Sequence, residues 1–157
     1  MSDTRPVLFA TDGSPSAHEA QRDALQLAQL LDVPIVVVSV AHTTLPAVGY
    51  GAHGYSQVVS QLTEAEHKRV EKVVDGVAAA AAAVGVPCFT VAAEGVVIDE
   101  ICRIAQDRNA RLIVVGSHGW SAARRLLSGS VSTGLVHSAP CPVLVIRGAD
   151  HALDRAA

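Results

Sequence analysis

The sequence lacks any block of charge of one sign and any long apolar run. Its 157 residues include 12 Lys and Arg against 15 Asp and Glu, for a net charge of −3, and these charges are scattered along the chain. This distribution argues against a nucleic-acid-binding stripe and against a polybasic membrane anchor. No segment approaches the ~18 apolar residues of a membrane span, and the apolar run near the N-terminus is far shorter than a signal-peptide core. We therefore expect a cytoplasmic protein without a nucleic-acid or membrane partner.

Residues that commonly form disulfides or bind metals are also sparse. The three cysteines, Cys88, Cys102 and Cys141, are odd in number, widely spaced and without a C-x-x-C pair. The seven histidines show no paired metal-binding spacing. We expect small buried thiols and no protein-built metal site.

The composition that remains favours one globular domain with a substantial core. The chain is 50% hydrophobic, and it is too short for two ordinary domains, so residues 1–157 are treated as one domain. Short, unbroken runs of apolar and β-branched residues are typical of parallel strands that are buried on both faces. Five such runs occur: Val7–Ala10, Ile35–Val40, Cys88–Ala92, Leu112–Val115 and Val143–Ile146.

Stretches of helical period lie between these runs. Apolar residues recur at helical spacing within 17–31, 70–84 and 98–105. Strands that alternate with helices predict an open five-stranded parallel α/β sheet with helices on both faces, because the crossovers are almost always right-handed. The segment 41–57 is rich in Pro, Gly and Tyr and is expected to be a long loop.

Two loops are candidates for a ligand site in such a sheet. Ligands bind beyond the carboxyl ends of the strands, where neighbouring strands send their helices to opposite faces. The first strand is followed by Asp12, then by Ser14 as a helix cap and Pro15 at the first helical position. The fourth strand ends at Gly116. If these two strands are neighbours, Asp12 and Gly116 face each other across a crevice, but the sequence alone does not establish that adjacency.

The loop after the fourth strand lacks every complete fingerprint of a familiar catalytic or nucleotide site. The nucleophile elbow G-x-S-x-G, the Walker motif and the Rossmann G-x-G-x-x-G are all absent. What remains is Gly116, Gly119 and Gly129, with Ser130 opening a helix. Glycines permit close backbone approach, and the first amides of a helix form an anion site. The pattern indicates a phosphate cradle; the alternative is that the glycines only turn the chain and Ser130 only caps its helix.

The same residues carry a resemblance to a known family. The spacing Gly116-x2-Gly119-x9-Gly129-Ser130, with "ATDGS" at the first strand and "HSAPCPVLVIR" near the end, resembles the ATP-binding branch of the universal stress protein family over residues 7–147. The resemblance implies a Rossmann-like fold, similar to the adenine nucleotide alpha hydrolases, with a parallel sheet of order 3-2-1-4-5. It also implies a nucleotide in the crevice.

The resemblance further implies which residues contact that nucleotide. Ala10, Thr11 and Asp12 would lie near the adenosine, and Val40 would contact the adenine edge through its backbone. Val115 and Gly116 would flank the ribose. The phosphates would be surrounded by Gly119, Gly129, Ser130, Val131 and Ser132. One departure is Ser39, where many members carry histidine; it matters little if the contact from Val40 is main chain.

The ligand implied is ATP, with AMP or ADP as alternatives, and Mg²⁺ can accompany the bound nucleotide with Asp12 as the nearest carboxylate. No catalytic residue is predicted: His118 is not expected to act, and Arg124 and Arg125 either contact phosphate or face solvent. Hydrolysis, if present, is expected to be slow. The alternatives are a slow ATPase or nucleotide-processing enzyme, and a nucleotide-independent interaction protein with a vestigial pocket. The resemblance also implies a homodimer through the edge strand Val143–Ile146.

Overall fold

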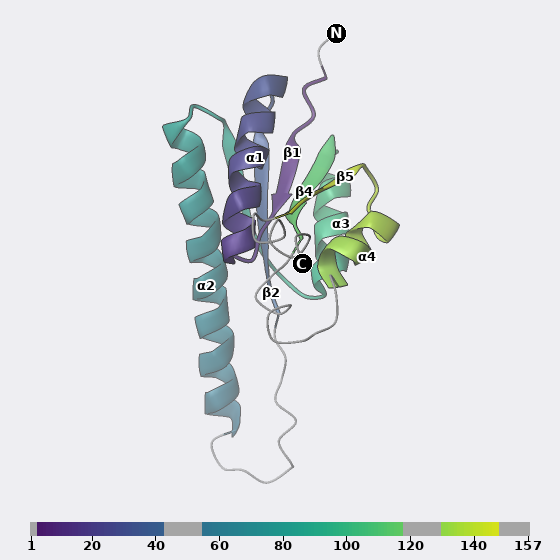
Figure 1. Ribbon diagram of the computed structural model, residues 1–157. Coiled ribbons are helices and arrows are strands. Elements are labelled where there is room, and N and C mark those ends of the chain that lie inside the picture. The colour runs from purple at the N-terminus through teal and green to yellow at the C-terminus, as the bar shows by residue number, and fades with distance from the viewer. Residues whose placement is uncertain (1–2, 43–54, 118–129, 148–157) are drawn as a thin grey trace, which may run out of the picture.

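The computed structural model describes residues 3–42, 55–117 and 130–147, and strands alternate with helices throughout them (Figure 1). The elements in chain order are β1 (Val7–Ala10), α1 (Pro15–Leu31), β2 (Ile35–Ala41), α2 (Tyr55–Ala83), β3 (Cys88–Glu94), α3 (Val97–Asp107), β4 (Leu112–Gly116), α4 (Ser130–Ser138) and β5 (Val143–Ile146). Each predicted strand is present, and β2, β3 and β4 run one or two residues further than their apolar runs.

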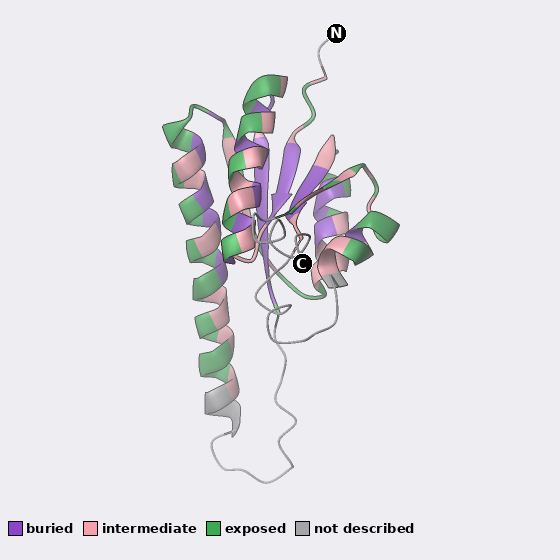
Figure 2. Ribbon diagram, in the orientation of Figure 1, coloured by how far each residue is buried: buried purple, intermediate pink, exposed green. Residues whose placement is uncertain are grey.

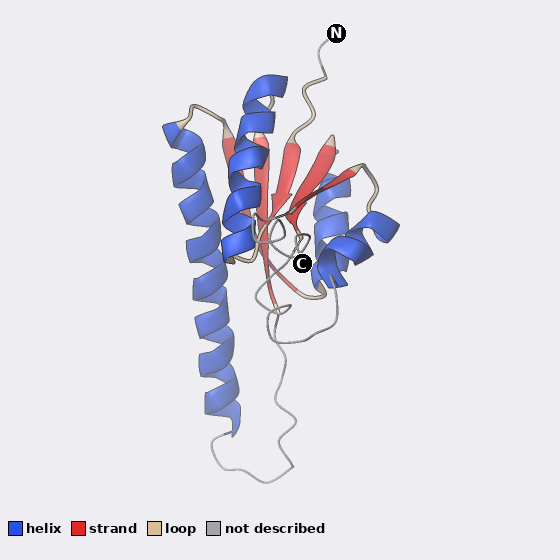
Figure 3. Ribbon diagram, viewed as in Figure 1, coloured by secondary structure: helices blue, strands red, loops and turns tan. Residues whose placement is uncertain are grey.

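The strands form one parallel sheet in the order β3-β2-β1-β4-β5, which confirms the expected fold. β1 lies between β2 and β4, so that Ala10 is the register partner of both Val38 and Val115. Helices α1 and α2 cover one face of the sheet, and α3 and α4 cover the other (Figures 1 and 3). The adjacency of β1 and β4, which the sequence left open, is therefore present.

Two apolar clusters hold the layers together, one on each face of the sheet. Phe9, Val37 and Val114 point from the strands into the first cluster, which α1 and α2 complete. Leu8 and Ile113 point into the second, where Ile104 of α3 joins them. Neighbouring strand residues alternate between the two clusters, as the two-residue period of a strand requires. The unbroken apolar runs arise because the central strands need apolar side chains on both faces (Figure 2).

The expectation that all five strands are buried on both faces is wrong for the two edge strands. Every residue of β1 and β2 is buried, but Phe89 of β3 is 51% exposed and Leu144 of β5 is 41% exposed. An edge strand has a neighbour on one side only, and the described helices do not cover these two side chains. Among the described residues, no helix combines the length and the apolar character needed to cross a bilayer.

The start of α1 follows the sequence signals closely. Ser14 occupies the cap position and its Oγ accepts a hydrogen bond from the N–H of Ala17 at 3.3 Å, with Pro15 beginning the helix. Ser14 is buried, and its hydroxyl satisfies a helix amide that would otherwise have no partner. The cap fixes the start of α1 at Pro15, three residues after Asp12.

A second buried serine differs from Ser14 in its bonding. Ser39 in β2 is 1% exposed, and its Oγ has no hydrogen-bond partner among the described residues. A buried hydroxyl without a partner loses its hydration and gains nothing in return. We therefore expect Ser39→Ala to leave the free energy of unfolding unchanged or to raise it by up to about 1 kcal/mol. Ser14→Ala should lower it by about 1 kcal/mol, because the cap is lost.

Denaturant unfolding of both variants beside the parent protein measures these differences. A loss of more than about 1 kcal/mol for Ser39→Ala would contradict the prediction, since it would show that the hydroxyl has a partner in solution, such as a bound water.

Candidate functional site

The carboxyl ends of β1 and β4 form the switch point of the sheet. After β1 the chain enters α1 on one face, and the helix that follows β4, α4, lies on the opposite face (Figure 1). Helices that leave neighbouring strands in opposite directions open a crevice between their loops. The candidate site is therefore bounded by the β1–α1 loop on one side and by Gly116 with the first turn of α4 on the other.

Gly116 brings these two sides close together. A Cβ placed on Gly116 would lie 3.2 Å from the carbonyl oxygen of Ser16 and 3.4 Å from the nitrogen of Ala17. Both atoms belong to the backbone of the first turn of α1, which cannot swing aside as a side chain can. Glycine at this position lets the end of β4 pack directly against the start of α1. The sequence predicted that the Asp12 and Gly116 sides face each other, and the structure places Gly116 close to the backbone of Ser16 and Ala17, just after the Asp12 turn.

Four of the predicted site residues share one apolar cluster. Ala10, Val40 and Val115 are buried in the cluster on the α3 and α4 face, and Val131 of α4 packs against it. Ala10 and Val115 are direct register partners in adjacent strands. These residues form an apolar floor beneath the switch point, contributed by β1, β2, β4 and α4.

Val40 presents its backbone to the space past the end of β1. Successive residues of a strand direct their N–H and C=O groups to opposite sides. Ala41 accepts from Gly95 on the β3 side, and Val38 accepts from the N–H of Thr11 on the β1 side at 2.9 Å. The backbone of Val40 therefore faces the β1 side as that of Val38 does, two residues beyond the bond between Thr11 and Val38. The N–H and C=O of Val40 therefore form an adjacent donor and acceptor beyond the end of β1.

The β1–α1 loop is folded by its own side chains. The Oγ1 of Thr11 accepts from the N–H of Gly13 at 3.1 Å, and the Oδ1 of Asp12 accepts from the N–H of Ser14 at 3.0 Å. Such local bonds are typical of Asp and Thr in turns, where the side chain replaces a backbone acceptor. Gly13 has φ of +75°, a conformation that favours glycine. The turn fixes the Asp12 carboxylate beside the start of α1.

Sequence analysis missed a contact from α2 to this loop. The Nη1 of Arg69 donates to the backbone oxygen of Asp12 at 2.9 Å, while Nε and Nη2 donate to both carboxylate oxygens of Glu66 at 2.8 and 2.6 Å. The guanidinium of Arg69 is the main reason that the pKa of Glu66 lies below its usual value, and the backbone of His42 lowers that pKa further. The E-x-x-R spacing is a helix ion-pair signal, but no local pattern relates residue 69 to residue 12.

The phosphate side of the predicted site is only partly described. Helix α4 begins at Ser130, as expected, so Val131 and Ser132 lie in its first turn. First-turn amides and the helix dipole favour a negative charge at that end. Gly119, Gly129, His118, Arg124 and Arg125 lie outside the described residues, and the predicted roles of these residues remain predictions.

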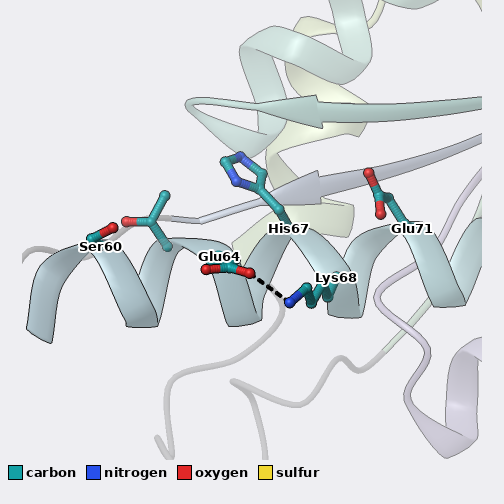
Figure 4. Close-up of a pocket in the computed structure, with 6 residues that line it drawn as sticks. Ser60, Glu64, His67, Lys68 and Glu71 are labelled. Atoms are coloured by element: carbon teal, nitrogen blue, oxygen red, sulfur yellow. Dashed lines mark hydrogen bonds and ion pairs between the residues drawn. The ribbon is translucent and has the colours of Figure 1, made fainter. Parts of the chain in front are cut away.

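A shallow hollow of about 550 Å³ lies along α2 (Figure 4). Six residues line it: Ser60, Thr63, Glu64, His67, Lys68 and Glu71. Lys68 pairs with Glu64 across its floor, and the Nε2 of His67 lies 3.1 Å from Glu94 at the end of β3. Small-molecule pockets are mostly apolar, whereas this lining is polar and charged. Nowhere in the described ranges do three or more His, Cys, Asp or Glu side chains form a group that could hold a metal.

The comparisons with known proteins all identify the same family. The model of the universal stress protein family matches residues 3–147. A universal stress protein of Methanocaldococcus jannaschii is 33% identical over 143 residues, covering 91% of this chain and 82% of the relative. A solved universal stress protein family member from Burkholderia pseudomallei is 29% identical, with a TM-score of 0.69 over 93% of this chain and 98% of that one. One from Arabidopsis thaliana, solved with AMP bound, is 21% identical, with a TM-score of 0.62 over 93% and 94%.

The packing of Gly13 against α2 gives a prediction that has a matched control. Gly13 and Gly85 have nearly the same φ, +75° and +73°, but a Cβ on Gly13 would lie 2.7 Å from Cγ2 of Val73, whereas one on Gly85 would meet nothing within 4 Å. Alanine at either position carries the same left-handed strain of about 1–2 kcal/mol. We expect Gly13→Ala to lower the free energy of unfolding by about 1 kcal/mol more than Gly85→Ala, because Val73 must move.

Denaturant unfolding of the two variants measures the difference. Adding Val73→Ala should then remove most of the excess cost of Gly13→Ala. Equal costs at the two glycines would show that the β1–α1 loop does not press against α2.

Proposed function

Because this chain belongs to the universal stress protein family, we propose that it is a nucleotide-binding module of stress response or regulation in the cytoplasm, and that its ligand is ATP. The observation that carries the proposal is the switch point between β1 and β4, beside which lie the Asp12 turn, the backbone of Val40 on its β1 side and the start of α4. Solved neighbours of this fold include complexes with AMP, cAMP and dAMP. Each of these is below 25% identity, so the choice of ATP for this chain rests on its own residues.

The nucleoside end is assigned to the ends of β1, β2 and β4. The apolar floor of Ala10, Val40 and Val115 offers a surface for the base and the sugar. The N–H and C=O of Val40 form a donor and acceptor pair that can hydrogen-bond the Watson–Crick edge of adenine, which carries an acceptor next to an amino group. Thr11, Asp12 and Gly116 then border the ribose.

The phosphate end is assigned to the glycine loop and to α4. The backbones of Gly119 and Gly129, the amides of Val131 and Ser132, and the hydroxyl of Ser130 supply donors for the phosphate oxygens. A magnesium ion fits here only as a companion of the nucleotide, since Mg²⁺ commonly takes most of its ligands from phosphate and water. Asp12 is the carboxylate that would complete its shell, with Oδ1 already held by Ser14.

Two other functions are distinguished by simple observations. An ATPase or nucleotide-processing enzyme on this scaffold would show turnover at ordinary enzymatic rates that is lost in Gly119 and Asp12 variants. An interaction protein with a vestigial pocket would carry no nucleotide, so mass spectrometry of the gently purified protein separates it from a binding module. Binding is favoured over catalysis because the sequence contains no Walker lysine and no assigned water-positioning base.

Calorimetric titration of ATP into four variants tests the phosphate cradle. Ser130→Ala removes one hydroxyl that donates to a charged group, and affinity should fall about tenfold to a hundredfold. Gly119→Val and Gly129→Val should weaken binding more, because a side chain blocks the approach of backbone to phosphate. His118→Ala is the matched control, and it should retain most of the affinity because the cradle uses backbone and serine groups.

Circular dichroism establishes that each variant is folded before titration. Full ATP affinity in the folded Gly119→Val and Gly129→Val variants would show that these glycines only turn the chain, and it would contradict the proposal of a phosphate cradle. A parent protein that binds no adenine nucleotide would defeat the proposed function as a whole.

We further propose that the protein forms a two-fold homodimer through β5. This strand lies at the edge of the sheet, and a strand edge with unpaired backbone groups favours pairing with another chain. Pro142 and Ile146 accept bonds from Ile113 and Ser117 of the β4 side, so the intervening odd residues, Val143 and Val145, turn their backbone groups to the outer edge. Antiparallel pairing of Val143–Ile146 with its mate would satisfy those groups.

The alternation in β5 makes the dimer testable with one pair of variants. Val145→Pro removes an N–H from the outer edge and leaves the ladder to β4 intact, so it should convert the dimer to a folded monomer that still binds ATP. Leu144→Pro removes an N–H from the β4 side, and it should destabilise the fold itself by about 3 kcal/mol or less. Sedimentation velocity at micromolar concentration measures the state, and a monomeric parent protein would contradict this proposal.

A further inference from the structure

We propose that the Glu66–Arg69 pair of α2 is a positioning device for the nucleoside half of the crevice: Arg69 holds the backbone of Asp12 and thereby sets the turn that borders the nucleotide. The inference rests on the proposed function, because it concerns how the same site is shaped. It assigns a role in binding to a helix from which none of the expected contact residues comes.

All three nitrogens of the Arg69 guanidinium are used in bonds to Glu66 and Asp12. Two of its nitrogens grip both oxygens of Glu66 at 2.8 and 2.6 Å, and the remaining terminal nitrogen donates to the backbone oxygen of Asp12 at 2.9 Å. A fork–fork pair fixes the plane of the guanidinium, so the third donor has a defined direction. Arg69 is therefore aimed at the turn by Glu66.

Glu66 ties the same device to the end of β2. The pKa of Glu66 is lowered first by its bond with Arg69 and also by the backbone of His42, which directly follows β2. Val40 lies two residues before His42. The pair thus spans the ends of β1 and β2, two of the three strands to which the nucleoside end is assigned. Their relative position sets the gap between the Asp12 turn and the backbone of Val40.

A second contact from α2 reinforces the first. Val73, one turn after Arg69, lies against Gly13, since a Cβ there would be 2.7 Å from Cγ2 of Val73. The β1–α1 turn is therefore held at Asp12 by a hydrogen bond and at Gly13 by packing. Two adjacent residues fixed by one helix leave the Asp12 carboxylate little freedom, because its Oδ1 is also held by Ser14.

Apart from His67, which pairs with Glu94 at the end of β3, the other ion pairs of the described helices join residues of the same helix. Lys68 pairs with Glu64, and both belong to α2. Arg103 pairs with Glu100 and Asp107, and all three belong to α3. Such exposed pairs within one helix contribute little beyond a few tenths of a kcal/mol. Lys68 is consequently a matched control: it directly precedes Arg69 on the same helix, and its hydrogen bond goes to Glu64 of that helix.

The test compares Arg69→Met and Lys68→Met in the full chain, with adenosine and ATP as the probes. Both substitutions keep a long unbranched side chain and remove one charge. We expect Arg69→Met to weaken the affinity for adenosine and for ATP by a similar factor, about fivefold to thirtyfold. Lys68→Met should change either affinity by less than about twofold. Arg69→Lys should fall between, because it keeps one donor but loses the planar fork.

The two probes separate positioning from direct contact. If Arg69 bound a phosphate itself, Arg69→Met would weaken ATP strongly and adenosine hardly at all, and that result would overturn the proposal. Equal effects of Arg69→Met and Lys68→Met would also overturn it. If the parent protein binds neither probe, the proposed function has failed; if it binds both and the two variants are alike, only this inference has failed.

A double-mutant cycle with Asp12→Ala separates positioning from a general loss of structure. When the Asp12 carboxylate is absent, Arg69→Met should cost much less affinity, because the side chain that Arg69 positions through the turn is then missing. Fully additive losses in folded variants, with the folded fraction checked by circular dichroism at the titration temperature, would show that Arg69 acts elsewhere and would refute the proposal.

Discussion

The parallel pairing of β1 with β4 is the constraint on which the rest of this molecule depends. Because both strands run the same way, their carboxyl ends meet at one edge, and because α1 and α4 leave toward opposite faces, the two loops separate there. Gly116 then decides how narrow the separation is, since its missing Cβ lets β4 reach the backbone of Ser16. The Asp12 turn, the apolar floor and the start of α4 all take their positions from this one pairing.

The sheet could be predicted from the sequence because burial imposes a local pattern. Runs such as Val7–Ala10 and Ile35–Val38 are apolar without alternation because both faces are covered. The order of the strands could not be derived in the same way, since pairing between β1 and β4 joins residues about a hundred positions apart; it came from the resemblance to a family. The exposure of Phe89 and Leu144 was missed for a related reason, because an edge strand has the composition of a central one.

The features of the candidate site also separate into those formed by neighbours in the chain and those formed by residues far apart in the sequence. The turn at Asp12 and the cap at Ser14 were predictable, because each is formed by neighbours in the chain. The availability of the Val40 backbone on its β1 side depends on where the ladder between β1 and β2 ends, and Arg69 reaches Asp12 across 57 positions. Both need the folded sheet before they exist. The roles expected for Gly119 and Gly129 belong to residues outside the described ranges.

The two halves of helix α2 differ in how many of their side chains are buried in the core. From Ser60 to Arg69 no side chain is buried, whereas Val70, Val74, Val77 and Ala81 after them belong to the core. The half that begins at Val70 opens only when the core opens, whereas the half before it is joined to the rest of the molecule by polar contacts such as Arg69 with Asp12 and His67 with Glu94, so it can unwind at a smaller cost. Arg69 stands at the boundary of these halves. Amide exchange along α2 would therefore change abruptly at one turn, and that turn is the one bonded to Asp12.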